Sequence, residues 1–181
     1  MPAHVTHWLD EVELASFDPP VPYDPADDDA SNLRAFLEML AHAEGTDRYG
    51  DQGGYNVLVG GTLFHSYADH PRRAVWLPKY GIFSTAAGRP QFLERTWDDL
   101  VGRYGYSDFT PANQDAGAKQ LIRQCKALQL IYDGHVRDAI HACRRIWASL
   151  PGAGYGQREV ATEKLVEVYR RAGGNVAEVQ T

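Results

Sequence analysis

The sequence predicts an α+β fold, mostly helical, with one small β-hairpin directly after the first helix of the domain. Three observations predict it. Residues 31–44 place apolar side chains at helical spacing. Residues 55–64 hold two short apolar runs separated by Gly60-Gly61, which is typical of a hairpin. From residue 93 onward, helical spacing recurs in several segments separated by glycine and proline.

Length and composition favour one globular domain. The chain has 181 residues, of which 44% are hydrophobic, enough for a sizeable core. No apolar run approaches the roughly 18 residues that span a bilayer, so we expect no membrane insertion. The N-terminus lacks a basic start followed by an apolar stretch, so we expect a protein made in the cytoplasm without a secretory signal.

Charge divides the chain near Ala30. Residues 1–30 contain eight acidic side chains and no Lys or Arg, whereas residues 31–181 carry a net charge of +2 with His taken as neutral. We expect residues 1–30 to be an acidic, proline-containing arm, either a disordered tail or a segment that docks an unknown partner through its apolar residues. Residues 31–181 then form the folded domain. The sequence has no dense basic patch with interleaved aromatic residues, so nucleic acid is not an expected partner.

The first helix of the domain is predicted to end at a carboxylate. Ser31 and Asn32 precede its apolar face and can cap its first amides, and Gly45 can take the left-handed conformation past its end. Glu44 is then the last helical residue. The apolar face consists of Leu33, Phe36, Leu37 and Leu40.

Glu44 is the candidate catalytic group. The carbonyl groups at a helix C-terminus disfavour a nearby anion, and burial disfavours it further, so both raise the pKa of the carboxyl. A carboxyl group protonated near neutral pH can act as a general acid. The alternative interpretation of Glu44 alone is a solvated residue at a frayed helix end.

The remaining chain continues the helical pattern. Residues 75–77 are expected to be extended and to stop at Pro78. Residues 84–91 form a loop of small residues, and Pro90 is placed to begin the next helix. Further helices are expected over about 93–104, 111–125, 133–147 and 159–171, with a second glycine-rich loop at 149–157.

Cysteine and histidine residues give no sign of a metal or cofactor site. Cys125 and Cys143 lie on predicted helix faces and are interpreted as small buried side chains, with a disulfide left open. His65 and His70 are isolated from other ligand types, so we expect no metal and no cofactor.

Separated motifs, in a fixed order, resemble one known family. They are residues 44–46 (EGT), 54–61 (GYNVLVGG), 69–72 (DHPR), 84–91 with Gly88-Arg89, and 147–157 (WASLPGAGYGQ). Together they resemble the lambda-type phage endolysins over about residues 33–178. The resemblance implies a lysozyme-like fold, in which a glycan cleft lies between a hairpin lobe and the helices.

The resemblance also implies a reaction. Members of that family are lytic transglycosylases, which are lyases that cleave the β-1,4 bond from N-acetylmuramic acid to N-acetylglucosamine in peptidoglycan. No water is added, because the muramic 6-hydroxyl attacks its own anomeric carbon and leaves a 1,6-anhydro ring. One carboxylate suffices, and Glu44 would serve as acid and then base. Such an enzyme lyses the host cell for a phage or prophage, acting in the periplasm on the cell wall once the membrane is permeabilised.

Substrate contacts are carried over from the same motifs. They are expected from Thr46, Asn56, Ser84, Arg89, Gln91, Tyr155 and Gln157. Two positions depart from the family pattern, because Asn56 replaces an aspartate and Pro90 replaces a tyrosine. Asn56 can hydrogen-bond a sugar but cannot act as a base, which disfavours hydrolysis through a second carboxylate.

Two alternatives remain open at this stage. One is a muramidase that hydrolyses the same bond with a water held by Asn56 or an aspartate. The other is a virion or secretion-apparatus component that is docked on the cell wall by residues 1–30.

Overall fold

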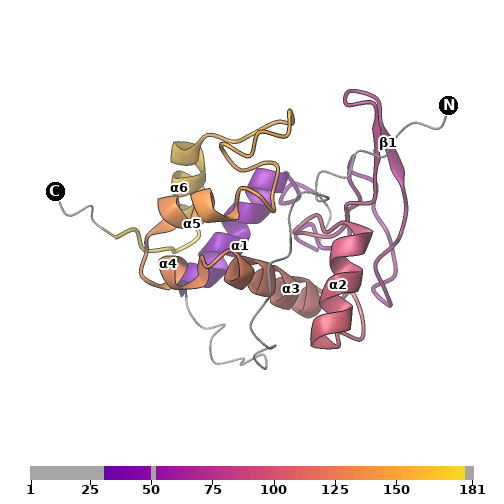
Figure 1. The fold of residues 1–181 in the computed structure, drawn as a ribbon, viewed down its shortest axis with the longest axis horizontal. Helices are drawn as coiled ribbons and strands as arrows, with labels where there is room; N and C mark the ends of the chain where they lie inside the picture. Colours follow the sequence, from indigo (N-terminus) through magenta and orange to yellow (C-terminus); the bar gives the residue numbers. More distant parts are fainter. Residues whose placement is uncertain (1–30, 50–51, 178–181) are drawn as a thin grey trace. The chain divides into compact units, whose positions relative to one another are not determined.

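The computed structural model describes residues 31–49 and 52–177, and they form an α+β fold, as the sequence predicts (Figure 1). The elements are α1 (Ser31–Glu44), β1 (Val75–Leu77), β2 (Ile82–Ser84), α2 (Glu94–Tyr104), α3 (Pro111–Gln124), α4 (Leu128–Tyr132), α5 (Val136–Cys143) and α6 (Thr162–Arg171). Within this part of the chain, none of the helices combines the length and the apolar character that a membrane span requires. The arm expected over residues 1–30, with its boundary near Ala30, lies outside the described residues and stays a prediction.

The described residues form two compact units that interleave along the chain. One unit consists of Thr46–Gly117, and the other combines residues 31–45 with residues 118–177. Helix α3 contributes its first part to one unit and its last part to the other.

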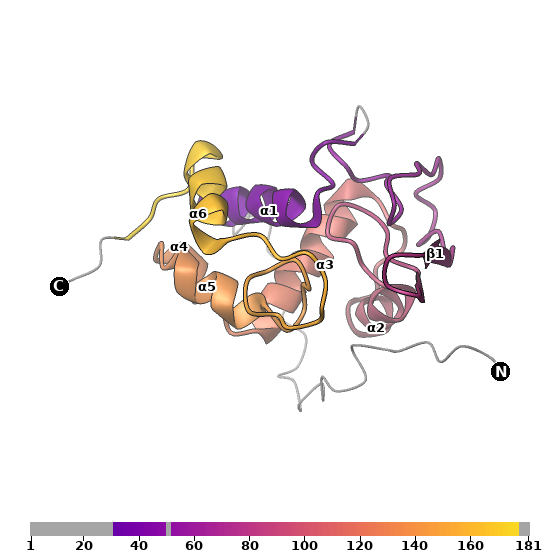
Figure 2. The ribbon, with the colours of Figure 1, turned by 90° about the horizontal axis from the view of Figure 1, so that it is seen from above.

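Helix α1 packs in the second unit with α4 and α6 (Figures 1 and 2). Of the predicted face, Leu33, Phe36 and Leu40 are almost fully buried, whereas Leu37 is only partly buried. The end is also as predicted, because Gly45 follows Glu44 with φ of 72°.

The predicted capping role of Asn32 is wrong. Asn32 lies inside the helix, and its side-chain amide donates to the Tyr132 carbonyl at the end of α4. Its amide oxygen accepts from the Asn175 backbone N–H. Asn32 therefore fastens the start of α1 to two distant segments instead of capping the helix.

The hairpin predicted over residues 55–64 is reduced to a single bridge between Val57 and Leu63. Its turn is present, since the Leu58 N–H donates to the Thr62 carbonyl at 2.7 Å. The other edge of this segment pairs with residues 86–88, because Val59 donates to the Ala86 carbonyl and Gly88 donates to the Val57 carbonyl. Residues 57–59 thus pair with residues 62–63 along one edge and with residues 86–88 along the other.

The two-stranded sheet lies further along the chain. Residues 75–77 are extended as predicted, but they pair antiparallel with Ile82–Ser84, a partner that the sequence analysis missed. The turn is closed by the Tyr80 and Gly81 N–H groups, which both donate to the Leu77 carbonyl. Trp76 and Phe83 pair across the strands with ring centroids 5.0 Å apart.

Pro90 does not begin the following helix. Helix α2 starts at Glu94, and Pro90 instead lies in a turn in which the Gln91 N–H donates to the Gly88 carbonyl at 3.1 Å. Gln91 takes a left-handed φ of 53°, which breaks the helical path after the proline. The Thr85 hydroxyl accepts from the Glu94 N–H and supplies the cap that the sequence analysis assigned to no residue.

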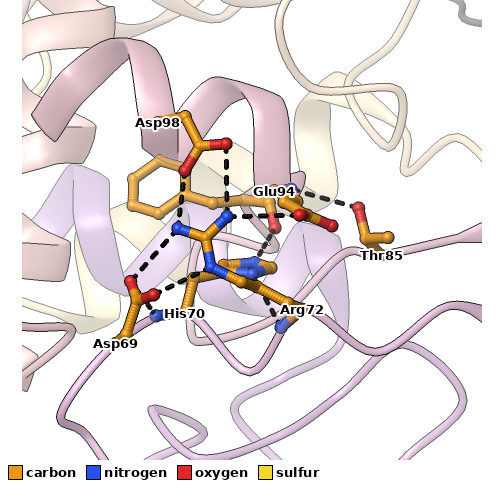
Figure 3. A network of polar contacts seen from close by, with 7 residues as sticks. Asp69, His70, Arg72, Thr85, Glu94 and Asp98 are labelled. Carbon is orange, nitrogen blue, oxygen red and sulfur yellow. Dashed lines mark hydrogen bonds and ion pairs between the residues drawn. The ribbon is translucent and has the colours of Figure 1, made fainter. Parts of the chain in front are cut away.

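An ion-pair network anchors the start of α2 to residues 69–72 (Figure 3). The Arg72 guanidinium donates to three carboxylates, those of Asp69, Glu94 and Asp98, with closest distances of 2.8, 3.2 and 2.7 Å. Arg72 holds the pKa of Asp69 below its usual value, mainly through this hydrogen bond. The network is half-exposed, so salt weakens it.

His70 lies beneath that network and has a structural role. Its Nδ1 accepts from the Arg72 N–H, so its Nε2 carries the proton that is donated to the Phe92 carbonyl at 2.9 Å. Burial lowers the pKa of His70, which favours the neutral ring. The ring also packs edge-on against Phe109 in the aromatic core of this unit.

The later helices of the second unit follow the predicted pattern with two differences. Helix α5 (Val136–Cys143) is shorter than the predicted 133–147, because residues 144–146 form a turn, and α4 is an additional helix. Val136, Ala139, Ile140 and Cys143 form the buried face of α5, as expected. Helix α4 was missed because its five residues are too short to show a period. Helix α6 begins at Thr162 and ends before Gly173, close to its predicted limits.

Candidate active site

Glu44 is held by a hydroxyl from a distant part of the same unit. The Ser149 hydroxyl donates to Glu44 Oε1 at 2.5 Å, across 105 positions in sequence. Ser149 is buried, and its backbone carbonyl accepts from the Val160 N–H at 2.9 Å. Backbone and side chain of Ser149 are therefore both fixed, so the hydroxyl is preorganised toward the carboxyl group.

Burial raises the pKa of Glu44 from 4.5 to about 7. Two smaller effects oppose this rise, the hydrogen bond from Ser149 and the positive charge of Arg158. Both stabilise the carboxylate, so neither form of Glu44 dominates strongly near neutral pH. A group with this property can donate a proton in one step and accept one in the next.

The glycine-rich loop after Ser149 is ordered by one carboxylate. Glu159 accepts hydrogen bonds from the Gly152 and Gly154 N–H groups, both at 2.8 Å. These two bonds lower the pKa of Glu159, because they favour its charged form. Gly152 and Gly154 both have φ near 78°, a conformation that side-chain-bearing residues rarely adopt.

Tyr155 and Gln157 lie on this loop, as the sequence predicts. Both are partly exposed. The Tyr155 hydroxyl donates to the Arg145 carbonyl at 3.0 Å, which fixes the orientation of the ring. The hydroxyl is already bonded to the Arg145 carbonyl, so the ring face is the part of Tyr155 that suits contact with a sugar.

In the other unit, Thr46 is bound to Arg89. The Thr46 side chain is buried, and its hydroxyl donates to the Arg89 carbonyl at 2.8 Å. Gly54 lies against the same residue, and a Cβ on Gly54 would come within 2.3 Å of the Thr46 carbonyl oxygen. Only glycine fits there, so Thr46 and Arg89 are held by close backbone packing.

Gln114 of α3 is the buried centre of this arrangement. Its side-chain oxygen accepts from the Arg89 N–H at 2.8 Å. Its amide group donates to the carbonyls of Tyr55 and Phe109 at 3.0 and 2.8 Å. A Cβ on Gly88 would lie 2.3 Å from the same side-chain oxygen, so the loop must carry glycine to approach it.

The Arg89 guanidinium belongs to a second network. It donates to the Tyr55 hydroxyl at 3.0 Å, and Tyr55 donates in turn to Asp115 Oδ2 at 2.8 Å. Burial, together with the charge of Asp115, raises the pKa of Tyr55 to about 12, so its hydroxyl keeps its proton. Asp115 is engaged as an acceptor and holds Arg89 through Tyr55.

Three further candidates lie in the same unit. Gln91 donates to the Gly88 carbonyl at 2.8 Å and closes the turn that carries Arg89. Ser84 ends β2, is nearly buried, and accepts from the Ala86 N–H at 3.2 Å. Asn56 is nearly buried, and its side-chain oxygen has no hydrogen-bond partner among the described residues.

The structure thus groups the predicted residues in two sets. Thr46, Arg89 and Gln91 are joined by hydrogen bonds or by one turn, and Glu44 shares its unit with the loop of Tyr155 and Gln157. The candidate list missed the residues that hold these groups, which are Ser149, Gln114, Asp115 and Glu159. Ser149 lies in the 147–157 motif, so the sequence offered a way to find it. Gln114 has no such motif around it and resembles any polar residue on a helix.

The chain matches known proteins over most of its length. The family model described as Endolysin matches residues 34–176. The endolysin of Escherichia phage lambda is 49% identical over 150 residues, covering 81% of this chain and 94% of that protein. The endolysin of Escherichia phage P2 is 47% identical over 154 residues, covering 79% and 93%. A solved structure, bacteriophage lambda lysozyme complexed with a chitohexasaccharide, has a TM-score of 0.79 at 44% identity and covers 87% of this chain and 100% of its own.

Proposed function

The chain belongs to the endolysin family, and from this premise we propose that it is a lytic transglycosylase that degrades peptidoglycan with Glu44 as its general acid and base. The bond cleaved is the β-1,4 linkage from N-acetylmuramic acid to N-acetylglucosamine. The observation that carries the proposal is the environment of Glu44, a partly buried residue whose desolvated carboxyl group has a pKa of about 7 and is oriented by Ser149.

The reaction follows from the two protonation states of Glu44. As the acid, Glu44 donates its proton to the glycosidic oxygen, and the N-acetylglucosamine leaves with that oxygen. As the carboxylate, Glu44 then takes the proton of the muramic 6-hydroxyl, whose oxygen bonds to the anomeric carbon. The proton returns to Glu44, so the enzyme is regenerated without water. The Ser149 hydroxyl stabilises the carboxylate between the two steps.

Transglycosylation is favoured over hydrolysis because the described candidates for a second carboxylate are poor ones. At the position of Asn56 the resemblance to the family implies an aspartate, and an amide cannot activate water as a base. Asp115 accepts a hydrogen bond from Tyr55 within the Arg89 network. Asp47 is exposed on a surface turn. A hydrolase of this fold needs such a group to activate water or to act as nucleophile.

We assign the glycan contacts to Arg89, Gln91, Tyr155 and Gln157, and a positioning role to Thr46 and Ser84. The Thr46 hydroxyl already donates to the Arg89 carbonyl, and the Ser84 hydroxyl already accepts from the Ala86 N–H. Asn56 has a nearly buried side-chain oxygen, which suits a sugar hydroxyl or amide donor. The lambda lysozyme structure was solved with a chitohexasaccharide, and the likeness of this chain to that protein supports glycan binding here as well. The enzyme would act on the wall once the membrane is permeabilised.

Mass spectrometry of the fragments released from purified peptidoglycan tests the proposal. The wild-type protein should release fragments with 1,6-anhydro-muramic ends, which are one water lighter than reducing ends. Glu44→Gln should fold and lower turnover by roughly 100-fold or more, since the amide cannot transfer the proton. Glu163→Gln, which changes an exposed carboxylate on α6, is the matched control and should keep its activity.

Other outcomes would point elsewhere. Reducing muramic ends would reject transglycosylation and identify a hydrolytic muramidase. Near-wild-type turnover by Glu44→Gln would remove Glu44 from the mechanism. If folded wild-type protein releases no fragments, the docked wall component becomes the better account, and deletion of residues 1–30 would then test their role as a docking arm.

A further inference from the structure

The outer face of the two-stranded sheet is aromatic. Trp76 of β1 and Phe83 of β2 are cross-strand partners, with ring centroids 5.0 Å apart and an angle of 52° between the ring planes. Their exposed fractions are 46% and 50%, and among the described residues only Leu63 is a further exposed large apolar side chain. Pairing across the strands stabilises a hairpin, but it does not require half of each ring to face solvent. The stability of the hairpin alone therefore does not account for this surface.

The opposite face of the sheet packs inward. Side chains alternate between the two faces of a strand, so Val75 and Ser84 lie on the face opposite the aromatic pair. Ser84 is buried. A Cβ on Gly60 would lie 3.8 Å from Val75 Cγ1, which places that glycine turn against β1. The aromatic pair thus points away from the face that carries Ser84, one of the candidate site residues.

The charges that border the aromatic pair are positive. Residues 73–83 contain Arg73 and Lys79 and no acidic residue. Both side chains are exposed, and Lys79 Nζ lies 5.2 Å from the centre of the Tyr80 ring in the turn. The neighbouring Arg72, in contrast, is engaged by three carboxylates. The outer face therefore suits a ligand that combines flat apolar surfaces with carboxylates.

We propose that this aromatic face, formed by Trp76 and Phe83 and bordered by Arg73 and Lys79, is a second binding site for peptidoglycan that holds the enzyme on the cell wall. The inference rests on the proposed function for the identity of the polymer. The sugar rings of a β-1,4-linked glycan present C–H groups on their faces, which pack on aromatic rings, and two adjacent rings can take two successive sugars. The stem peptides of peptidoglycan carry carboxylates, which complement the two cations.

Other occupants match this face less well. Each strand has only three residues, and the two half-exposed rings form a small apolar surface, whereas binding to a bilayer surface grows with the apolar area that is buried in it. A second copy of the chain would bring the same surface to both sides of a two-fold contact. Arg73 and Lys79 would then meet like charges, because residues 73–83 contain no acidic partner.

Sedimentation with purified insoluble peptidoglycan tests the proposal. Full-length Glu44→Gln, in which digestion is suppressed, is compared with the same chain carrying Trp76→Thr and Phe83→Thr, because threonine keeps the propensity for a strand. We expect the apparent affinity to fall by about tenfold or more. Leu63→Thr is the matched control, since it changes an exposed apolar side chain outside the sheet, and it should bind like its parent.

Charge variants and kinetics supply independent readouts. Arg73→Gln with Lys79→Gln should weaken binding several-fold at low salt and much less at high salt, since salt screens exposed charges. These two substitutions lie on exposed side chains, so they keep the comparison available if the aromatic double variant does not fold. With Glu44 intact, the aromatic double variant should raise KM on insoluble peptidoglycan and leave kcat, and the turnover of short soluble fragments, at the wild-type values.

The outcomes that overturn the proposal are distinct. Unchanged affinity of the folded aromatic double variant would reduce the pair to a stabiliser of the hairpin, even if its unfolding midpoint falls. Loss of binding to phosphatidylglycerol vesicles, with binding to peptidoglycan unchanged, would identify a membrane surface, and loss of a dimer in gel filtration would identify a second copy. If wild-type protein binds peptidoglycan through this face but releases no fragments, the proposed function fails while this inference stands.

Discussion

Replacing Glu44 by glutamine should stabilise the protein at alkaline pH while it removes activity. Glutamine has the same shape, stays neutral and can still bond to Ser149. The wild-type carboxyl has a pKa of about 7 in the folded protein against an ordinary value of 4.5. Between these values the folded protein keeps a proton that the unfolded chain releases. The free energy of unfolding therefore falls as the pH rises from 4.5 to 7, and stays lower above that range.

The size of the effect follows from the shift. A rise from 4.5 to about 7 corresponds to about 3 kcal/mol of free energy lost by the wild type above pH 7. Below about pH 5 the loss should be under about 1 kcal/mol, because the pH is then close to or below the ordinary value of 4.5 and only a small part of the shift is expressed. The stability difference between Glu44→Gln and wild type should thus grow by about 2–3 kcal/mol from pH 5 to pH 9.

Urea unfolding at a series of pH values measures this difference. Glu163→Gln is the control of opposite sign, because the ion pair with Arg137 lowers the pKa of Glu163. Its carboxylate stabilises the folded protein above the ordinary glutamate pKa, so this variant should lose stability at neutral and alkaline pH. A constant difference between Glu44→Gln and wild type across the pH range would refute the claim that folding raises the pKa of Glu44.

Three further predictions concern the residues around the site. Ser149→Ala removes a hydrogen bond that lowers the pKa of Glu44, so the alkaline limb of the kcat/KM profile should move up by about one pH unit, and an unmoved limb would contradict this. Gln114→Ala should cost about 2–4 kcal/mol in urea unfolding, because the Arg89 N–H and two carbonyls lose their buried partner; a cost under about 0.5 kcal/mol would contradict the role given to Gln114. Glu159→Gln should raise KM for glycan a few-fold with little change in kcat, since it loosens the glycine-rich loop, and steady-state kinetics would show whether kcat falls instead.

The structure was predicted most accurately where the same residues determine both the local conformation and the packing in the core. The apolar spacing of α1 names the same face that the core buries, and Gly45 ends the helix directly after Glu44. The raised pKa of Glu44 was predicted from the helix end and from burial, and burial is the cause that raises it in the structure. Local propensity and tertiary packing agree at this position, so a local argument was sufficient.

Prediction failed where a segment forms its hydrogen bonds with residues distant in sequence and not with its neighbours. Residues 57–59 carry a hairpin signal, but their free edge bonds to residues 86–88, and no periodicity reports such a choice. Pro90 is a residue type that often begins a helix, yet the left-handed backbone of Gln91 prevents a helix from starting there. The helix starts at Glu94 instead, where the Thr85 hydroxyl accepts the first N–H. Asn32 likewise bonds to Tyr132, a hundred positions away.

The residues that position the site could not be predicted from the sequence either, because their hydrogen bonds also join segments distant in sequence. Gln114 bonds to three separate segments, and each bond depends on how the loops return to α3. A polar residue on a helix gives no local sign of such contacts, whereas the paired glycine at Gly88 does give one, because a Cβ there would collide with Gln114. A glycine in a loop of small residues can thus indicate that another side chain approaches the backbone closely, but it does not show which residue that is.

The most direct test of the central claim is the titration of Glu44 itself by carbon NMR of the side-chain carboxyl, with Glu44→Gln to assign the signal. The account predicts a midpoint near pH 7 in the folded wild type, and a higher midpoint in Ser149→Ala. A midpoint near 4.5 in the folded protein would contradict it, because Glu44 would then be a carboxylate at neutral pH with almost no proton to donate.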